Sequence, residues 1–447
     1  MSIHPRAKAH GFLEIFYKVR KFAISEKLQT ATGLWSTATL RQSTLTSFST
    51  IINAGLGALF YFFLAYSLGS HDYGIFTLLT TLIAMLASIA DLGTDQGLVR
   101  YLPKYKNDFD AQKAIMKLSL KIKLLSGLVT FFALTIFARS ISSSVFNRPD
   151  FTTFVPFVGL GVIAQLLFSY STSLSQAMER FFLWSGLFIG TNSMRLFIAA
   201  AFFQLGFLNS TSASLVYIIL PFLGFVTSLT FFDKKFMKVR GENRFLKELF
   251  GFNKWIFAFL VVSTVGSKLE IFFTTRFLGF SLLGIYGLIQ QLSSILPQLT
   301  SAIGAVTSPK FASFDKNFKN KKYTLKVLLL TGTLGLISLL VMIPLGYLVL
   351  NTIGNDYITG FLPFIVLLIA MAIFLVTSPM RDSIIYYFEK PSFFFWLGIV
   401  HALAVTLLSI SLIPRFDLMG TSYVVLSGQI LIAISSVSYF VYLNKKN

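Results

Sequence analysis

A succession of long apolar stretches runs through the chain and restricts its fold more than any other feature of the sequence. A membrane with a hydrocarbon core about 30 Å thick is crossed by about 20 residues of helix. The mean hydropathy is +0.72 and 13% of the residues are charged, whereas soluble domains carry roughly 25% charged residues. Most of this chain therefore cannot face water, and an ordinary soluble enzyme is excluded.

The apolar stretches predict twelve membrane-spanning helices in an all-α integral membrane protein. Their ends fall at Gly, Pro, Asn and Asp, which interrupt helices or favour turns. A chain of 447 residues is long enough for twelve such spans joined by short loops. The predicted spans are 43–69, 74–98, 118–138, 151–175, 182–205, 212–232, 253–278, 282–306, 325–350, 358–379, 392–413 and 418–443.

The basic residues are distributed unequally between the two sides of this arrangement. Of the 38 Lys and Arg, 30 fall in the terminal segments and in the loops on the same side, against 4 on the opposite side. Because positively charged loops stay in the cytoplasm, both termini are predicted to be cytoplasmic in a multi-pass protein of the cytoplasmic (inner) membrane. The net charge of +20 then reflects topology and attraction to anionic membrane lipids, and no nucleic-acid partner is expected.

The spans and loops predict five segments along the chain. Residues 1–42 form a basic cytoplasmic extension, whose amphipathic stretch from Phe12 to Lys27 is predicted to lie on the inner membrane surface. Two six-helix bundles, 43–232 and 253–443, are joined by a basic cytoplasmic linker, 233–252, and residues 444–447 are a cytoplasmic tail.

The two bundles share an internal repeat. The segment from Leu68 to Phe76 aligns with that from Leu278 to Tyr286 at an offset of 210 residues, and 102–105 matches 308–311 at an offset of 206. Because six spans separate the equivalent points, the halves have the same orientation. We therefore predict a pseudo-twofold axis along the membrane normal, which is common in transporters that bind substrate between two halves.

Polar side chains within three spans fall on single helix faces, which indicates the faces that avoid lipid. Helix-to-helix hydrogen bonding is the alternative explanation for each residue, and the coincidence of stripes in repeat-related helices favours a hydrated cavity. The stripes are Gln290, Ser294, Gln298 and Ser301 in span eight, the repeat-equivalent Thr80, Ala84, Ser88 and Asp91 in span two, and Gln165, Ser169, Thr172 and Gln176 in span four.

Ionisable residues within spans are the strongest candidates for the substrate site. Arg195 lies one turn from Asn192 in span five, and Lys268 and Glu270 lie in span seven. Arg195 and Lys268 are predicted to contact an anionic substrate, because a guanidinium fits phosphate and an ammonium is a movable point charge. An ion pair between Arg195 and Glu270 that holds the bundle together is the alternative.

Two aspartates near the end of span two allow two interpretations. Asp91 and Asp95 lie one turn apart, and they either line the inner mouth and hold a coupling cation or form an interfacial pair balanced by Arg100 and Lys104. No cofactor, metal site or enzymatic triad is expected, because the His residues are scattered and Cys is absent. Coupling to H⁺ or Na⁺ is left open.

Two stretches of the chain resemble Wzx-type polysaccharide flippases. The stretch from Leu68 to Tyr105 is similar to their N-terminal block, where a Leu-Gly turn, a Tyr-Gly-hydrophobic-Phe start of span two and a later Val-Arg-Tyr recur. The stretch from Lys268 to Phe311 is similar to the start of their second half, where Gly-Ile-Tyr and a later Ser-Pro-Lys-hydrophobic are typical, and where an acidic residue usually stands at the position of Glu270. The resemblance extends over about residues 43–443 and indicates the multidrug/oligosaccharidyl-lipid/polysaccharide exporter superfamily.

This resemblance implies a function. It implies that the protein moves an undecaprenyl-diphosphate-linked oligosaccharide across the cytoplasmic membrane by alternating access, for surface polysaccharide biosynthesis. The expected partners are this lipid-linked oligosaccharide and membrane lipids, with a polysaccharide polymerase and glycosyltransferases acting on the same substrate. The alternative is a cation-coupled small-molecule exporter of the same superfamily. A membrane glycosyltransferase is disfavoured, because the predicted extracytoplasmic loops have about a dozen residues or fewer.

Overall fold

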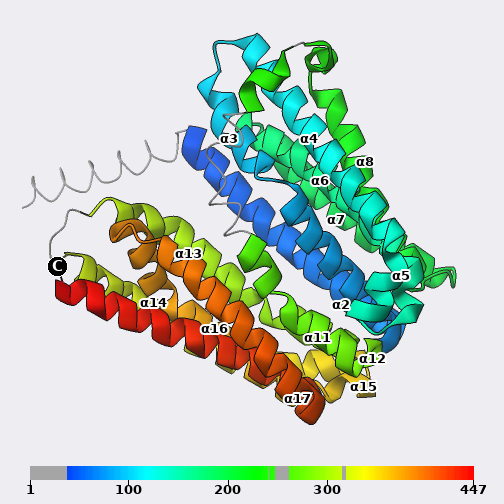
Figure 1. Ribbon diagram of the computed structural model, residues 1–447, viewed down its shortest axis with the longest axis vertical. Coiled ribbons are helices and arrows are strands. Elements are labelled where there is room, and N and C mark those ends of the chain that lie inside the picture. The colour runs from blue at the N-terminus through cyan, green and yellow to red at the C-terminus, as the bar shows by residue number, and fades with distance from the viewer. Residues whose placement is uncertain (1–37, 240, 247–260, 315–318, 447) are drawn as a thin grey trace, which may run out of the picture.

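The computed structural model describes residues 38–239, 241–246, 261–314 and 319–446. In this part of the chain the structure is almost entirely helical and contains no strand. Figure 1 shows the helices in two groups that meet at one end and diverge toward the other. Most of the predicted extension, with its amphipathic stretch Phe12 to Lys27, lies outside the described residues, as do parts of the predicted linker and of span seven.

The first group of helices, which we term the N-lobe, comprises residues 38–246. Short 3₁₀ and π segments join its helices and make up most of residues 229–245. The elements are α2 (Ala38–Ala90), α3 (Thr94–Lys104), α4 (Phe109–Ile136), α5 (Ala138–Ser140), η1 (Ile141–Val145), η2 (Pro149–Phe154), α6 (Val155–Ala177), α7 (Phe181–Gln204), α8 (Ser210–Ser228), η3 (Leu229–Phe231), η4 (Lys234–Lys238) and η5 (Glu242–Phe245).

The second group, which we term the C-lobe, comprises residues 261–446. Its second span is divided into α12 and α13 at Ser294, three residues before Pro297, which cannot donate a backbone hydrogen bond. The elements are α11 (Leu269–Leu278), α12 (Phe280–Ser293), α13 (Ile295–Ala312), α14 (Lys319–Ile353), α15 (Asn355–Ile358), α16 (Phe361–Asp382), η6 (Ser383–Tyr387) and α17 (Ser392–Lys446).

The described helices agree with the predicted spans, with shifted ends. Nine helices among the described residues are long and apolar enough to cross a membrane. Two of them are each a pair of spans joined at a non-helical residue, Gly69 in α2 and Asp417 in α17. Predicted span seven is described only from residue 261. Predicted span two, 74–98, is wrong at its end, because the chain breaks after Ala90 and continues as the separate helix α3.

Gly69 and Gly279 show that the sequence repeat is also a backbone repeat. They are 210 residues apart, and their dihedral angles are nearly the same, with φ 72° and ψ 173° at Gly69 and φ 85° and ψ −174° at Gly279. Positive φ is strained for residues with a Cβ atom but accessible to glycine. Each glycine therefore ends one span and turns the chain into the next at equivalent points of the two lobes.

The lobes pack against each other with pseudo-twofold symmetry just after these glycines. A Cβ atom on Gly74 would lie 1.8 Å from the carbonyl oxygen of Phe280, and one on Gly284 would lie 2.0 Å from that of Ser70. The repeat offset of 210 residues relates Gly74 to Gly284 and Ser70 to Phe280, so the two contacts are equivalent. Gly287 meets Thr77, its own repeat equivalent, so the axis passes close to this pair. Glycine at these positions permits a backbone approach that other residues would block.

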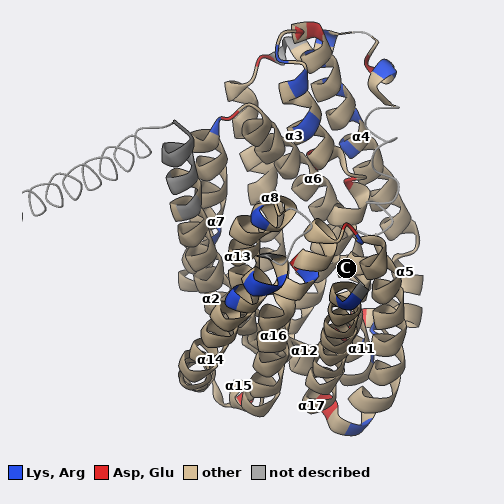
Figure 2. Ribbon diagram, turned by 90° about the vertical axis from the view of Figure 1, so that its left-hand side faces the viewer, with Lys and Arg blue, Asp and Glu red and all other residues tan. Residues whose placement is uncertain are grey.

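Contacts between the lobes gather at one end of the molecule, which we term the closed end. There Tyr357 Oη donates to the carbonyl oxygen of Ala65 at 3.1 Å, and Ser70 Oγ donates to Asp356 at 3.4 Å. At the opposite end, which we term the open end, the lobes diverge (Figure 1). Figure 2 faces the open end and shows Lys and Arg near α3, α4 and the C-terminus, whereas the helix shafts are mostly free of charge.

Candidate functional site

A cavity of about 1140 Å³ lies within the C-lobe. It extends from Glu270 and Tyr286, in the middle of the lobe, to Pro309, Tyr386 and Phe394 near the open end. Ligand pockets for drug-sized molecules measure roughly 300–1000 Å³. The cavity is therefore large enough for a head group that combines phosphates with sugar rings.

Glu270 forms the deep end of this cavity. The residue is 6% exposed, and its Oε1 accepts a hydrogen bond of 3.4 Å from Gln290 Nε2, which comes from the neighbouring helix α12. Tyr286 is fully buried beside it, and its hydroxyl has no hydrogen-bond partner among the described residues. A buried polar atom without a partner is uncommon and indicates a missing water or ligand.

Two basic residues line the cavity from different helices. Lys268 immediately precedes α11, and Arg381 lies in the last turn of α16. The guanidinium of Arg381 donates to the carbonyl oxygen of Phe374 at 2.9 Å and lies 3.7 Å from the centre of the Phe374 ring. Neither residue forms an ion pair within 4 Å with another described side chain. Both cations are therefore available to an anion in the cavity.

Further polar groups complete the lining. Asp382 Oδ2 accepts a hydrogen bond of 3.1 Å from Thr307, and the ring of His401 faces Gly428. Gln429 Oε1 is buried without a hydrogen-bond partner in the described part of the chain. Amide, hydroxyl and imidazole groups of this kind suit the hydroxyl groups of sugars, which both donate and accept hydrogen bonds.

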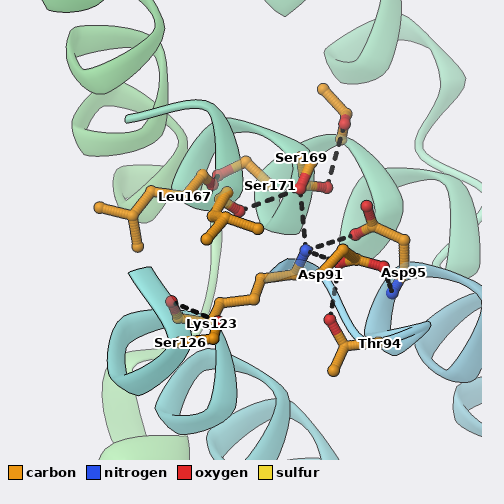
Figure 3. Close-up of polar contacts among 10 residues, drawn as sticks. Asp91, Thr94, Asp95, Lys123, Ser126, Leu167, Ser169 and Ser171 are labelled. Atoms are coloured by element: carbon orange, nitrogen blue, oxygen red, sulfur yellow. Dashed lines mark hydrogen bonds and ion pairs between the residues drawn. The ribbon is translucent and has the colours of Figure 1, made fainter. Parts of the chain in front are cut away.

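The N-lobe contains a different polar cluster, in which the charged side chains bind protein groups and line no cavity wall described above (Figure 3). Lys123 on α4 is completely buried, and its ammonium binds Asp91, Asp95 Oδ1 at 2.9 Å and Ser169 Oγ at 2.8 Å. Asp91 also accepts from Thr94 at 2.8 Å. These contacts join α4 and α6 to the turn after α2, where the chain changes direction into α3. The cluster therefore fixes the break in predicted span two.

A second N-lobe cluster surrounds Arg195 on α7. Its Nη1 donates to Asn192 Oδ1 at 3.1 Å, its Nη2 donates to the carbonyl oxygen of Tyr217 at 3.2 Å, and the guanidinium lies 4.2 Å from the centre of the Tyr217 ring. Asn192 in turn donates to Asn53 on α2 at 2.6 Å. Arg195 therefore links α2, α7 and α8, and no ion pair joins it to Glu270, although both residues are described.

The structure separates the predicted site residues into two sets. Lys268, Glu270 and Gln290 line the C-lobe cavity, and Gln298 lies next to it, where its amide contacts Ser294 at 3.4 Å. The others belong to the N-lobe and are not part of the cavity wall: Arg195, Asn192, Gln165 and Asp91.

Sequence reasoning missed two residues in these sites. Lys123 was recognisable as a basic residue inside an apolar span, but its partner Asp91 is 32 residues away. Arg381 is placed by the sequence in the loop after predicted span ten, 358–379, whereas α16 continues to Asp382 and carries Arg381 into the cavity wall.

Residues 39–315 match the family model described as polysaccharide biosynthesis protein. No curated protein is significantly similar to the chain. Among solved structures, "Lipid II flippase MurJ, inward closed conformation" is similar over 89% of this chain and 87% of its own, with a TM-score of 0.69 and 14% identity.

Transporters with the same fold are also similar. An inward-facing multidrug resistance MATE family transporter of the MOP superfamily matches over 88% of this chain and 94% of its own, with a TM-score of 0.67 and 12% identity. An outward-facing MATE transporter matches over 91% and 95%, with a TM-score of 0.57 and 12% identity. These similarities confirm the multi-pass helical membrane fold and the resemblance found in the sequence. Since the family model matches more than half of the chain, the protein belongs to the polysaccharide biosynthesis protein family of Wzx-type flippases.

Proposed function

We propose that the protein flips a polyprenyl-diphosphate-linked oligosaccharide across the cytoplasmic membrane, for surface polysaccharide biosynthesis. The observation that carries this proposal is the C-lobe cavity, where Lys268 and Arg381 lie among amide and hydroxyl groups and form no ion pair within 4 Å with any described residue. Charge-assisted hydrogen bonds from Lys and Arg recognise phosphate oxygens. The polar groups around them match sugar hydroxyls, while the polyprenyl chain stays in the lipid.

The shape of the molecule supports alternating access. The lobes touch at the closed end, and the cavity reaches toward the open end. The open end also carries most of the basic loops, so we assign it to the cytoplasm together with both termini. The substrate would enter from the cytoplasmic side and leave after the closed end opens. A polysaccharide polymerase and glycosyltransferases would act on the same lipid-linked substrate.

We place the coupling cation, H⁺ or Na⁺, at Glu270. The carboxylate is buried in the middle of the lobe, and it accepts a hydrogen bond from a neutral amide, that of Gln290. A buried carboxylate without a partner cation is costly, so it binds a proton or a cation. Lys268 lies two residues away, just before α11, and lines the same cavity. No ion pair within 4 Å joins it to Glu270, although both residues are described.

The proposal is tested by a flipping assay in proteoliposomes. A fluorescent polyprenyl-diphosphate oligosaccharide is placed in both leaflets, and a membrane-impermeant quencher is added outside. With active protein the whole signal is quenched as lipid reaches the outer leaflet, whereas liposomes without protein retain about half. Quenching that stays at the level of protein-free liposomes, from folded protein, would contradict the proposal.

Export of small molecules is the second candidate function. The carboxylates Glu270 and Asp382 in the cavity favour a cationic substrate. The same proteoliposomes, loaded with a cationic dye and given a proton or sodium gradient, separate the two functions. Dye export without lipid flipping would select this second candidate.

A further inference from the structure

Two arginines hold the lobes together at the closed end. Arg148 of the N-lobe donates from Nε to the carbonyl oxygen of Thr275 at 3.1 Å. Arg276 of the C-lobe donates from Nη1 to the carbonyl oxygens of Ser144 and Val145, the latter at 2.8 Å. Each arginine thus binds the backbone within a few residues of the other. We term Arg148 and Arg276 the arginine latch.

The backbone of both lobes is shaped to receive the latch. Thr275 lies in the last turn of α11, and Val145 ends η1, so each guanidinium meets the negative end of a helical segment. The guanidinium of Arg148 also packs on Gly279, where a Cβ atom would lie 2.7 Å from Nη2. Glycine at 279 therefore suits the positive φ, and the Arg148 guanidinium lies over the space that a side chain here would enter.

The latch brings two positive charges together without a carboxylate. Asp150, the nearest acidic residue in the chain, is exposed, and no ion pair among the described residues joins it to either arginine. Both guanidiniums are half-buried, and their hydrogen bonds to described residues go to backbone carbonyl groups. The pseudo-twofold axis does not repeat this arrangement, because Tyr357 takes the place of an arginine at the equivalent carbonyl of Ala65. Both charges therefore lie on one side of the axis.

Opening of the closed end would remove every one of these hydrogen bonds, since each crosses between the lobes. The two guanidiniums, one on each lobe, would then face each other across the opening without these carbonyl partners. Two guanidinium forks match the oxygens of a diphosphate, which accept bidentate hydrogen bonds.

We propose that Arg148 and Arg276 form a binding site for a diphosphate at the extracytoplasmic mouth, which is masked in this state by the carbonyl groups of the opposite lobe. The site rests on the proposed function, which supplies the diphosphate. In this scheme the head group replaces the carbonyls as the lobes part, and it leaves when the latch closes again.

Cysteine labelling tests this proposal without measuring transport. The chain has no Cys, so Thr77→Cys, buried at the closed end against Gly287, introduces a single thiol. Its labelling by an impermeant maleimide reports opening of that end in the full-length purified protein. We expect slow labelling of Thr77→Cys alone, labelling several-fold faster after Arg148→Gln with Arg276→Gln, and unchanged labelling after Arg139→Gln with Arg415→Gln, which removes two exposed arginines outside the latch.

Inorganic pyrophosphate is the probe for the anion. It should speed labelling of Thr77→Cys several-fold when both arginines are present and have no effect in the double glutamine variant. Arg148→Lys with Arg276→Lys keeps the charge but loses the forks, so a weaker response is expected. Lys268→Gln with Arg381→Gln should leave the response intact, which separates this site from the C-lobe cavity.

Two results would overturn the proposal. In the first, labelling is faster in the double glutamine variant, but pyrophosphate has no effect on Thr77→Cys with both arginines present. The arginines would then hold the lobes together without binding an anion. A response that disappears with Lys268 and Arg381 would assign the anion to the cavity. Neither result depends on flipping, so a failure here is distinguishable from a failure of the proposed function.

Discussion

The two lobes share a backbone repeat but use their polar side chains differently. In the N-lobe the buried ionisable groups bind neighbouring protein groups: Lys123 binds two aspartates and a serine, and Arg195 binds an asparagine and a carbonyl group through its two Nη atoms. In the C-lobe, Lys268, Glu270 and Arg381 line an open cavity. The described ionisable groups of the N-lobe therefore bind mainly other protein groups, whereas those of the C-lobe line a cavity that a ligand can enter.

Charge inside a membrane bundle therefore does not by itself identify a substrate site. A buried charge whose partners are all protein groups stabilises the arrangement of its helices. A charge beside a cavity, with few protein partners, is available to a substrate. The loss of a basic residue should therefore reduce stability in the N-lobe and transport in the C-lobe.

The largest effect is expected from Lys123→Met. Removal of one partner from a buried ion cluster leaves uncompensated charge, which costs about 3–5 kcal/mol. We expect a correspondingly lower midpoint in thermal unfolding of the purified protein. Lys121→Gln is the matched control, because Lys121 is exposed two residues earlier and a surface pair contributes about 0–1 kcal/mol. Equal midpoints for the two variants would contradict the assignment of the N-lobe cluster as structural.

In the C-lobe, Lys268→Gln with Arg381→Gln should reduce flipping with little change in stability. A hydrogen bond to a charged group contributes about 1.5–3 kcal/mol, so each loss is expected to weaken diphosphate binding about 10- to 100-fold. Substrate concentration for half-maximal flipping is the measurement. The control pair Lys310→Gln with Lys390→Gln removes two exposed lysines of the same lobe. If the double variant flips with an unchanged half-maximal substrate concentration, the cavity does not bind the substrate.

Glu270→Gln tests whether the carboxylate at the deep end of the cavity couples flipping to a cation gradient. The amide keeps the shape and a hydrogen bond to Gln290 but cannot exchange a proton or bind a cation as a carboxylate does. Flipping that responds to a pH or Na⁺ gradient in the parent should become insensitive to it. Glu270→Asp should keep the response. A gradient dependence that survives in Glu270→Gln would place coupling elsewhere.

The smallest effect is expected where the linker meets the N-lobe. Glu242 binds Lys117 at 3.4 Å and Lys121 at 3.7 Å, and Phe236 and Phe245 are buried beside it. A hydrogen bond from its own backbone amide, followed by Lys117, lowers the pKa of Glu242 below its usual value. The contact is therefore present at neutral pH and is lost as acid protonates the carboxylate below that lowered pKa.

Hydrogen exchange of residues 236–245 measures this effect. Glu242→Gln should speed exchange modestly at neutral pH, after correction for intrinsic rates. In acid, exchange of the unmodified protein should speed up further as Glu242 is protonated, and this additional increase should be absent from Glu242→Gln. Identical exchange in both proteins at neutral pH would show that the buried aromatic side chains alone hold the linker.

The sequence predicts the fold well because hydropathy and repetition are local signals. The apolar stretches indicate the spans, and the offset of 210 residues anticipates the matching backbone at Gly69 and Gly279. The close approach at Gly74 and Gly284 follows from the same repeat but requires the packing of two lobes to become visible.

The sites are less predictable because their partners are distant in sequence. The neighbours Arg100 and Lys104 are the obvious partners for Asp91 and Asp95, whereas the structure brings Lys123 between them. Arg195 and Lys268, predicted to share a substrate, lie in different lobes. A shift of three residues at the end of predicted span ten suffices to hide Arg381 from a sequence-based search.

Photo-crosslinking shows directly whether the C-lobe holds the substrate. A polyprenyl-diphosphate oligosaccharide with a photoreactive group on its first sugar is bound to the full-length protein, irradiated, and the modified peptides are identified by mass spectrometry. We expect adducts on α11, α13 and α16 that unlabelled lipid competes away and that are lost in Lys268→Gln with Arg381→Gln. Competed adducts on α6 and α7 around Arg195, with none in the C-lobe, would contradict this expectation.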